Sequence, residues 1–190
     1  MIEDIRSFIA IELSEVLRHK LKRLLEELKK TGADVKWVRP ESVHLTLKFL
    51  GSVSREKLEN IATAVRPVVE TYEPFQLTAQ RIGCFPSSRN PRIVWVGLGE
   101  EGGAVARLQR EIESKTADLG FPPEERPFRP HLTLGRVRSP KKKDSLVAMI
   151  EKISQIDLGS FPADKVILFR SDLHPEGAIY TKMYEFLMKK

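Results

Sequence analysis

The amino-acid sequence predicts an α+β fold: two pseudo-symmetric lobes of mainly antiparallel sheet, with helices packed outside and a central groove between the lobes. The first observation behind this prediction is that the tetrapeptide His-Leu-Thr-Leu occurs twice, at residues 44–47 and 131–134, each time shortly after an Arg-Pro pair. The second is that both copies lie in the same order of expected elements: strand, helix, His-Leu-Thr-Leu strand, helix, strand, turn, strand. The repeat therefore indicates a duplicated unit.

The expected elements of the first half follow from its hydrophobic periodicity. Residues 5–13 alternate as a strand does, and Ser14 is a suitable N-cap for a helix over 15–30. A second helix is expected to begin at Ser54 and to run to about residue 71, and Pro67 is expected to kink it or end it early. The other elements are strands, at 35–38, 43–51, 75–85 and 92–99.

The second half repeats this order after the strand at 92–99. Its later elements are a helix at 104–119, strands at 131–137, 166–173 and 178–187, and a helix at 144–154. We expect one two-lobed domain over residues 1–190, with a first half of about 1–91 and a second half of about 92–190. Because the closing strand of each unit opens the next, the terminal strand is expected to return to the first lobe.

Composition and charge narrow the class of protein. A hydrophobic fraction of 41% and a charged fraction of 31% are typical of a globular protein. No apolar run approaches the roughly 20 residues that cross a bilayer, and the acidic N-terminus is unlike a signal peptide, so a cytoplasmic protein without membrane contact is expected. The net charge of +6 fits either a polyanionic partner such as nucleic acid or a solvated basic surface. The single cysteine, Cys84, cannot form an intramolecular disulfide.

The repeated tetrapeptide places its polar residues on one side of a strand. Residues i and i+2 of a strand point the same way, so that His44 and Thr46 share one face, and His131 and Thr133 share one face in the second copy. Such alternation occurs in any half-buried strand. Two copies at matching positions of a duplicated unit instead predict that the two histidines meet across a pseudo-twofold axis.

Two histidines that flank one phosphate suit phosphodiester chemistry. One neutral imidazole can accept a proton and one imidazolium can donate a proton near neutral pH. The hydroxyl groups of Thr46 and Thr133 can bind the non-bridging oxygens, and no metal or cofactor is needed. A metal site is the competing use of two histidines, but neither tetrapeptide has a nearby Asp, Cys or second His, and Glu41 is out of phase with His44. No GxSxG motif is present either.

The flanks of the two tetrapeptides resemble those of a known family. The segments RSFIAIEL, WVRPESVHLTLKFLG and RPFRPHLTLGR, together with Ser171-x-Leu173 followed by Gly177 and Tyr180, are similar to the 2H phosphoesterases, and most of all to their RNA 2′,3′-cyclic phosphodiesterase (2′-5′ RNA ligase) branch. The resemblance covers essentially the whole chain.

The resemblance implies an activity and roles for several residues. It implies hydrolysis of an RNA 2′,3′-cyclic phosphate end to a 2′-phosphomonoester, with His44 as proton donor, His131 as proton acceptor and a minor reverse 2′-5′ ligation. It also implies a phosphate contact for Arg136, although strict alternation would put Arg136 on the leucine face unless the strand bulges or ends at Gly135. Arg129, two residues before His131, is a further candidate for binding the phosphate.

Several alternatives remain open from the sequence. The same histidines could serve a small cyclic nucleotide phosphate or a 2′-5′ oligonucleotide, or the protein could bind RNA ends without catalysis. The expected partner is RNA with a cyclic phosphate terminus, such as a tRNA fragment, and the expected state is a monomer. Among the aromatic residues, Trp37, Phe49 and Phe128 could stack on a base or pack in the core. His19 and His174 are expected on the surface without a role.

Overall fold

A computed structural model describes residues 4–175 and 177–189 of the chain. The strands are β1 (Ile5–Glu12), β2 (Val35–Trp37), β3 (His44–Val53), β4 (Phe75–Pro86), β5 (Pro91–Gly99), β6 (His131–Val137), β7 (Asp157–Ala163), β8 (Lys165–Asp172) and β9 (Ile179–Leu187). The helices are α1 (Glu15–Lys29), α2 (Arg55–Val69), α3 (Ala104–Ala117) and α4 (Lys143–Lys152), with a short 3-10 turn, η1 (Pro40–Ser42).

The expected elements are present, with local differences. The side chains of Ser14 and Ser54 accept hydrogen bonds from Leu17 N and Lys57 N, so both serine caps are confirmed. Pro67 lies inside α2, which continues to Val69, so the proline does not end the helix early. The sequence-based prediction missed β7, whose residues DLGSFPA contain a glycine and a proline and lack the alternation of the other strands.

All the strands described belong to one sheet, in the order β7-β4-β5-β6-β3-β1-β8-β9, with β2 paired to β6. Every pairing is antiparallel. The sheet consists of two halves, which we name the β1 lobe (β3, β1, β8, β9) and the β5 lobe (β6, β5, β4, β7). The two lobes join where β3 and β6 pair at a single position, Leu45 opposite Leu132.

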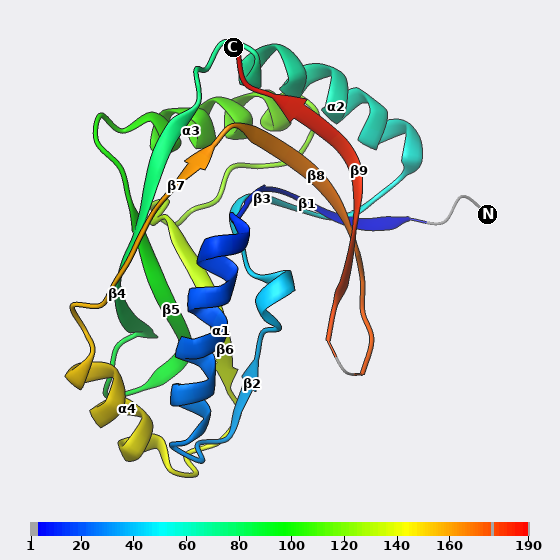
Figure 1. Cartoon of the computed structure of the whole chain (residues 1–190). Coiled ribbons are helices and arrows are strands. Elements are labelled where there is room, and N and C mark those ends of the chain that lie inside the picture. The colour runs from blue at the N-terminus through cyan, green and yellow to red at the C-terminus, as the bar shows by residue number, and fades with distance from the viewer. Residues whose placement is uncertain (1–3, 176, 190) are drawn as a thin grey trace.

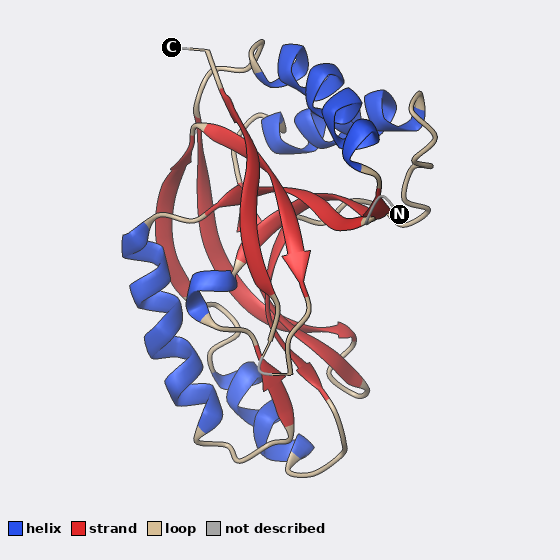
Figure 2. Ribbon diagram, turned by 90° about the vertical axis from the view of Figure 1, so that its right-hand side faces the viewer, coloured by secondary structure: helices blue, strands red, loops and turns tan. Residues whose placement is uncertain are grey.

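The helices cover the sheet in two pairs. Helices α2 and α3 contact each other and lie against strands of the β1 lobe, whereas α1 contacts β7 and α4 contacts β4 in the β5 lobe. Figure 1 shows the sheet curling between these two pairs, and Figure 2 shows the pairs at opposite ends of the molecule. The helix that follows β1 therefore covers the β5 lobe, and the helix that follows β5 covers the β1 lobe. The last two strands, β8 and β9, extend the sheet beyond β1.

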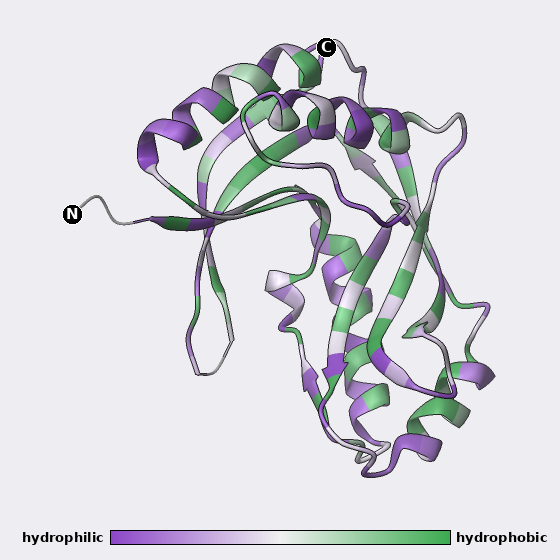
Figure 3. Cartoon of the chain, turned by 180° about the vertical axis from the view of Figure 1, so that it is seen from behind, coloured by the Kyte–Doolittle hydropathy of each residue, from purple (hydrophilic) through white to green (hydrophobic). Residues whose placement is uncertain are grey.

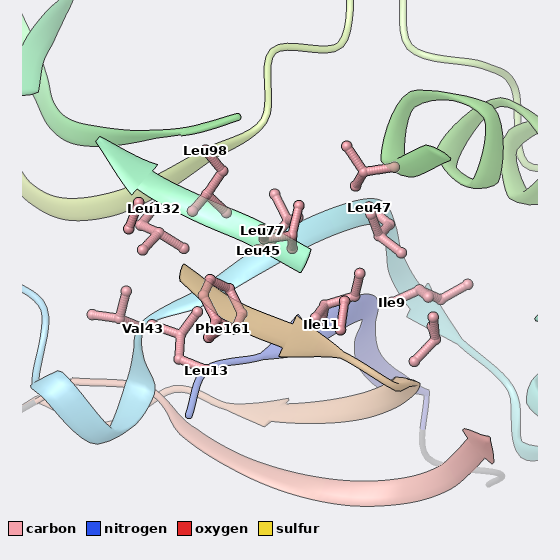
Figure 4. Close-up of a cluster of buried hydrophobic side chains, with 14 of the residues drawn as sticks. Ile9, Ile11, Leu13, Val43, Leu45, Leu47, Leu77, Leu98, Leu132 and Phe161 are labelled. Carbon is pink, nitrogen blue, oxygen red and sulfur yellow. The ribbon is translucent and has the colours of Figure 1, made fainter. Parts of the chain in front are cut away.

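The core lies between the sheet and the helices. Hydrophobic and hydrophilic positions alternate along the elements, as expected where one side is buried (Figure 3). Leu45 and Leu132 are fully enclosed in one continuous cluster with the apolar sides of the helices, and Figure 4 shows them among neighbouring core residues. We name the opposite face of the sheet, to which the alternate residues point, the inner face.

Candidate active site

The two His-Leu-Thr-Leu segments are neighbours in the sheet. Because Leu45 pairs with Leu132 in antiparallel register, continuing that register sets His44 opposite Thr133 and Thr46 opposite His131. The leucines point into the core, so the four polar side chains point to the inner face. Diagonal neighbours across such a pair of strands are about 7–8 Å apart, a separation at which two imidazoles can flank one tetrahedral group.

Both segments end in a β-bulge at the same position. In β3 the ladder with β1 passes from Thr46 to Lys48, so that Leu47 is the extra residue. In β6 the ladder with β5 passes from Thr133 to Gly135, so that Leu134 is the extra residue. A bulge sends two successive side chains to the same side of the sheet.

The bulges decide which later residues reach the inner face. Leu47 and Lys48 are both buried, as are Leu134 and Gly135, and the next residues, Phe49 and Arg136, are exposed. Ile93, which pairs with Arg136, and Trp95, which pairs with Thr133, are two residues apart on β5 and share a face. Arg136 therefore lies on the same face as Thr133, through the bulge that the sequence required. At Gly135 a Cβ atom would lie 2.6 Å from Val35 Cγ1 and 2.8 Å from Trp37 Cε3, so that no larger residue fits without movement.

His44 lies in an aromatic setting. Its ring stacks on Phe8 with centroids 4.6 Å apart and meets Tyr180 edge-on at 5.2 Å. Its Nδ1 is 2.9 Å from the carbonyl oxygen of Ser42, which can only accept, so Nδ1 carries the hydrogen and Nε2 is left for a ligand. Burial lowers the pKa of His44 from 6.5 to about 4, against the opposing effects of the Ser42 carbonyl and of Glu12.

His131 has the same tether and a more open setting. Its Nδ1 is 2.6 Å from the carbonyl oxygen of Arg129, so its Nε2 is also left for a ligand. The ring is half-buried and meets Phe85 edge-on at 5.2 Å. A cavity of about 330 Å³ adjoins it, lined among others by Phe85, Trp95, Arg81 and Arg129. Arg129 thus lies beside His131, as the sequence suggested.

Arginines from both lobes act electrostatically on Tyr180, the half-buried neighbour of His44. Burial raises the pKa of the Tyr180 hydroxyl, while the positive charges of Arg136, Arg6 and Arg39 act to lower it. The guanidinium of Arg39 also donates to the carbonyl oxygen of Ala178 at 3.0 Å. Arg136 comes from the β5 lobe and Tyr180 from the β1 lobe, so the positive charge spans the junction of the lobes.

Sequence reasoning missed several of these neighbours. Phe8 and Phe169 stack on each other with centroids 5.2 Å apart and form, with Ala10 and Ile167, a small apolar cluster on the inner face. The only signal was a run of four consecutive apolar residues in the middle of each strand, 8–11 in β1 and 166–169 in β8, which indicates burial on both faces there. Arg6 and Arg39 carried no signal beyond their charge.

Most of the other residues singled out from the sequence lie away from the inner face; the exception is Phe49, whose ring centroid is 6.2 Å from that of Phe8. Trp37 and Phe128 pack against the core, while Phe49 is 56% exposed. The exposed ring of His19 lies with Nδ1 2.8 Å from the carbonyl oxygen of Glu15, one turn earlier in α1, and His174 lies exposed in the β8–β9 turn. Cys84 is half-buried, and burial raises the pKa of its thiol to about 11, which disfavours a reactive thiolate.

The described part of the chain contains neither a metal-binding cluster nor a membrane-spanning helix. No three His, Cys, Asp or Glu side chains gather there into a group that could hold a metal ion. No helix in residues 4–175 and 177–189 combines the length and apolarity that a membrane crossing requires.

Comparison with known proteins matches both halves of the chain separately. The profile of the family described as LigT like Phosphoesterase matches residues 11–95 and again residues 96–180. The chain belongs to the LigT-like phosphoesterases. The resemblance to 2H phosphoesterases that the two tetrapeptides carried is therefore confirmed, and the two matched ranges each contain one His-Leu-Thr-Leu segment.

Curated relatives and solved structures agree with this family. The RNA 2′,3′-cyclic phosphodiesterase of Methanothermobacter thermautotrophicus is 41% identical to this LigT-like phosphoesterase over 182 residues, covering 96% of this chain and 98% of the relative. The protein of the same name from Archaeoglobus fulgidus is 36% identical, covering 95% and 99%. The crystal structure of TT0787 of Thermus thermophilus has a TM-score of 0.82 at 27% identity, covering 96% and 97% of the two chains. Escherichia coli LigT in its apo form has a TM-score of 0.78 at 25% identity, covering 99% of each. The predicted α+β fold is confirmed.

Proposed function

We propose that this LigT-like phosphoesterase hydrolyses 2′,3′-cyclic phosphate ends of RNA to 2′-phosphomonoesters without a metal ion. The observation that carries the proposal is the pairing of Leu45 with Leu132, which sets two identical His-Thr pairs on one face of the sheet. The names of the curated relatives support the same reaction. A minor reverse reaction, joining RNA ends through a 2′-5′ bond, follows from microscopic reversibility.

The proposed reaction moves one proton on each side of phosphorus. His131 Nε2 accepts a proton from water as the water oxygen forms a bond to phosphorus. The bond from phosphorus to the 3′ oxygen breaks, and His44 Nε2–H donates a proton to that leaving oxygen, so that the phosphate stays on the 2′ oxygen. The hydroxyls of Thr46 and Thr133 donate to the non-bridging oxygens, and Arg136 balances their charge.

The donor role requires His44 to be protonated when substrate is bound. In the free protein burial keeps the pKa of His44 at about 4, so that its ring is neutral at pH 7. The Ser42 carbonyl and Glu12 already favour the cation, and the anionic phosphate adds a negative charge on the open side of the ring. We therefore propose that His44 gains its proton together with the substrate.

The surroundings of the histidines support a nucleotide chain as the substrate. The cavity beside His131 offers two aromatic walls, Phe85 and Trp95, and two arginines, Arg81 and Arg129, and we propose that it receives the terminal nucleoside. The arginines around Tyr180 and the net charge of +6 would attract the RNA backbone. We further propose that the enzyme acts as a monomer in the cytoplasm, where tRNA fragments are one class of RNA with such ends.

The test uses an oligoribonucleotide with a 2′,3′-cyclic phosphate end, incubated with the protein in EDTA. The proposal requires a product with the phosphate on the 2′ oxygen, which resists a 3′-specific phosphatase. A 3′-phosphate product, or activity that disappears with the chelator, would contradict the mechanism. A panel with ADP-ribose 1″,2″-cyclic phosphate and a 2′-5′ dinucleotide distinguishes the small-substrate alternatives, and salt-dependent RNA binding with no product would indicate a non-catalytic end-binding protein.

A further inference from the structure

A buried ion pair lies behind the first His-Leu-Thr-Leu segment. Lys48, on β3, and Glu113, on α3, have side chains that are 2% and 9% exposed, and Lys48 Nζ lies 2.9 Å from Glu113 Oε2. All the other ion pairs among the described residues have at least one side chain that is 20% exposed or more. The Lys48–Glu113 pair is thus the enclosed one.

The pair ties three segments together. Lys48 Nζ also donates to the carbonyl oxygen of Pro122 at 2.5 Å, and Glu113 Oε2 accepts from the backbone N–H of Glu124 at 3.2 Å. Gln109, itself buried, donates from Nε2 to Glu113 Oε1 at 3.2 Å and to the carbonyl oxygen of Leu47 at 3.4 Å. The bulge of β3, one face of α3 and the start of the loop after α3 are therefore held by one hydrogen-bond network.

The loop held in this way leads to the second histidine. It runs from residue 118 to residue 130, leaving α3 on the β1 lobe and entering β6 on the β5 lobe, as the yellow-green segment after α3 shows in Figure 1. Its far end supplies the Arg129 carbonyl that binds His131 Nδ1. Lys48 itself is four residues after His44 on the same strand. The network therefore links the strand that carries His44 to the loop that leads from α3 to His131.

Stability alone does not explain such a pair. Taking two charges out of water costs several kcal/mol per ion, and apolar side chains of similar volume at the same place are often as stabilising or more so. The corresponding position in the second bulge is occupied by Gly135, without any charge. The direct pairing of β3 with β6 is one residue pair long, so it constrains the angle between the lobes weakly.

We propose that the Lys48–Glu113 pair is a positioning device that fixes the crossover loop to β3 and thereby sets the spacing of His131 from His44. This role rests on the proposed function, because spacing matters to turnover only if both imidazoles act on one phosphate. A displacement of about 1 Å in such a site can lower the rate roughly 100-fold.

The test separates positioning from stability with a double variant. Lys48→Met/Glu113→Leu removes both charges and keeps apolar volume, so the variant is expected to remain folded at the assay temperature, with a melting temperature lowered by the lost hydrogen bonds to Pro122, Glu124 and Gln109. Without the tethers to Pro122 and Glu124, kcat on a cyclic-phosphate oligoribonucleotide is expected to fall about 10- to 100-fold, with a smaller change in KM. The matched control, Lys165→Met/Glu185→Leu, removes the ion pair between β8 and β9 and is expected to leave kcat unchanged.

A distance measurement tests the same idea without activity. Spin labels at Asn60 on α2 and Lys152 on α4, in a chain with Cys84→Ser, report the separation of the two lobes. The Lys48→Met/Glu113→Leu variant is expected to broaden this distance distribution relative to the wild type and to the control. A double variant with wild-type kcat and an unbroadened distribution overturns the positioning role. A wild-type protein that leaves cyclic phosphates intact contradicts the proposed function instead, and the distance measurement then still decides whether the pair holds the lobes.

Discussion

The two His-Leu-Thr-Leu segments are identical in sequence, yet their histidines have different surroundings. His44 stacks on Phe8 and touches Tyr180 in an apolar cluster, whereas His131 borders an open cavity lined by Phe85. In both rings Nδ1 is bonded to a backbone carbonyl oxygen two residues earlier in the chain. The two segments therefore share the tether of the ring but not the residues around it. Two side chains of the same type, in the same local sequence, are thus made chemically distinct by the residues that fold against them.

The largest expected effect comes from removing either imidazole. His44→Asn and His131→Asn each remove the Nε2 atom that would exchange a proton, so kcat on a cyclic-phosphate oligoribonucleotide should fall by about 10²- to 10⁴-fold. Single-turnover assays measure this fall, and His19→Asn, on an exposed helix position, serves as the control. If either site variant turned over at more than a tenth of the wild-type rate, that histidine would not be a proton carrier.

The second effect concerns the stability of the fold and its dependence on pH through His44. Burial depresses the pKa of folded His44 to about 4, whereas the unfolded group titrates near 6.5. Between these values the unfolded chain binds a proton that the folded protein excludes, so the free energy of unfolding decreases as the pH falls from about 6.5 to about 4. The contribution of His44 is fully present above pH 6.5 and amounts to at most about 3 kcal/mol.

Urea unfolding at several pH values measures this contribution as a difference between proteins. In His44→Gln the part of the pH dependence that belongs to His44 should disappear, so that its curve is flatter than that of the wild type between pH 6.5 and pH 4. Parallel curves for wild type and His44→Gln would show that the ring is not kept neutral by its surroundings.

The comparison of the segments also shows what the sequence could and could not predict. The repeat of four residues, with the alternation around it, was enough to predict every described strand except β7, the duplicated order of elements and the common face of each His-Thr pair. The surroundings of the histidines depend on residues far away in the chain. Phe8 reaches His44 through the β1–β3 ladder, and Tyr180 reaches it from the last strand, so neither could be assigned from the motif itself.

Arg136 is the intermediate case. Simple alternation points this residue to the wrong face, and the bulge that corrects it arises where Leu134 and Gly135 both turn to the core. The glycine is needed because Val35 and Trp37 fill the space that a side chain would occupy. The sequence contained the glycine but did not reveal its neighbours, so the bulge could be stated only as a condition.

The smallest expected effect distinguishes the residues that follow the two bulges, Arg136 and Phe49. They occupy equivalent positions on the inner face, and only Arg136 carries a charge. Arg136→Met should raise KM for the oligoribonucleotide about tenfold and reduce the slope of log affinity against log salt concentration by about one, because one phosphate contact is lost. Phe49→Leu should leave that salt slope unchanged, and Arg136→Lys should restore it because a cation remains. Binding titrations between low and moderate salt measure all three variants. If Arg136→Met kept the wild-type slope, the guanidinium would not touch the phosphate, and the bulge in β6 would serve packing around Gly135 alone.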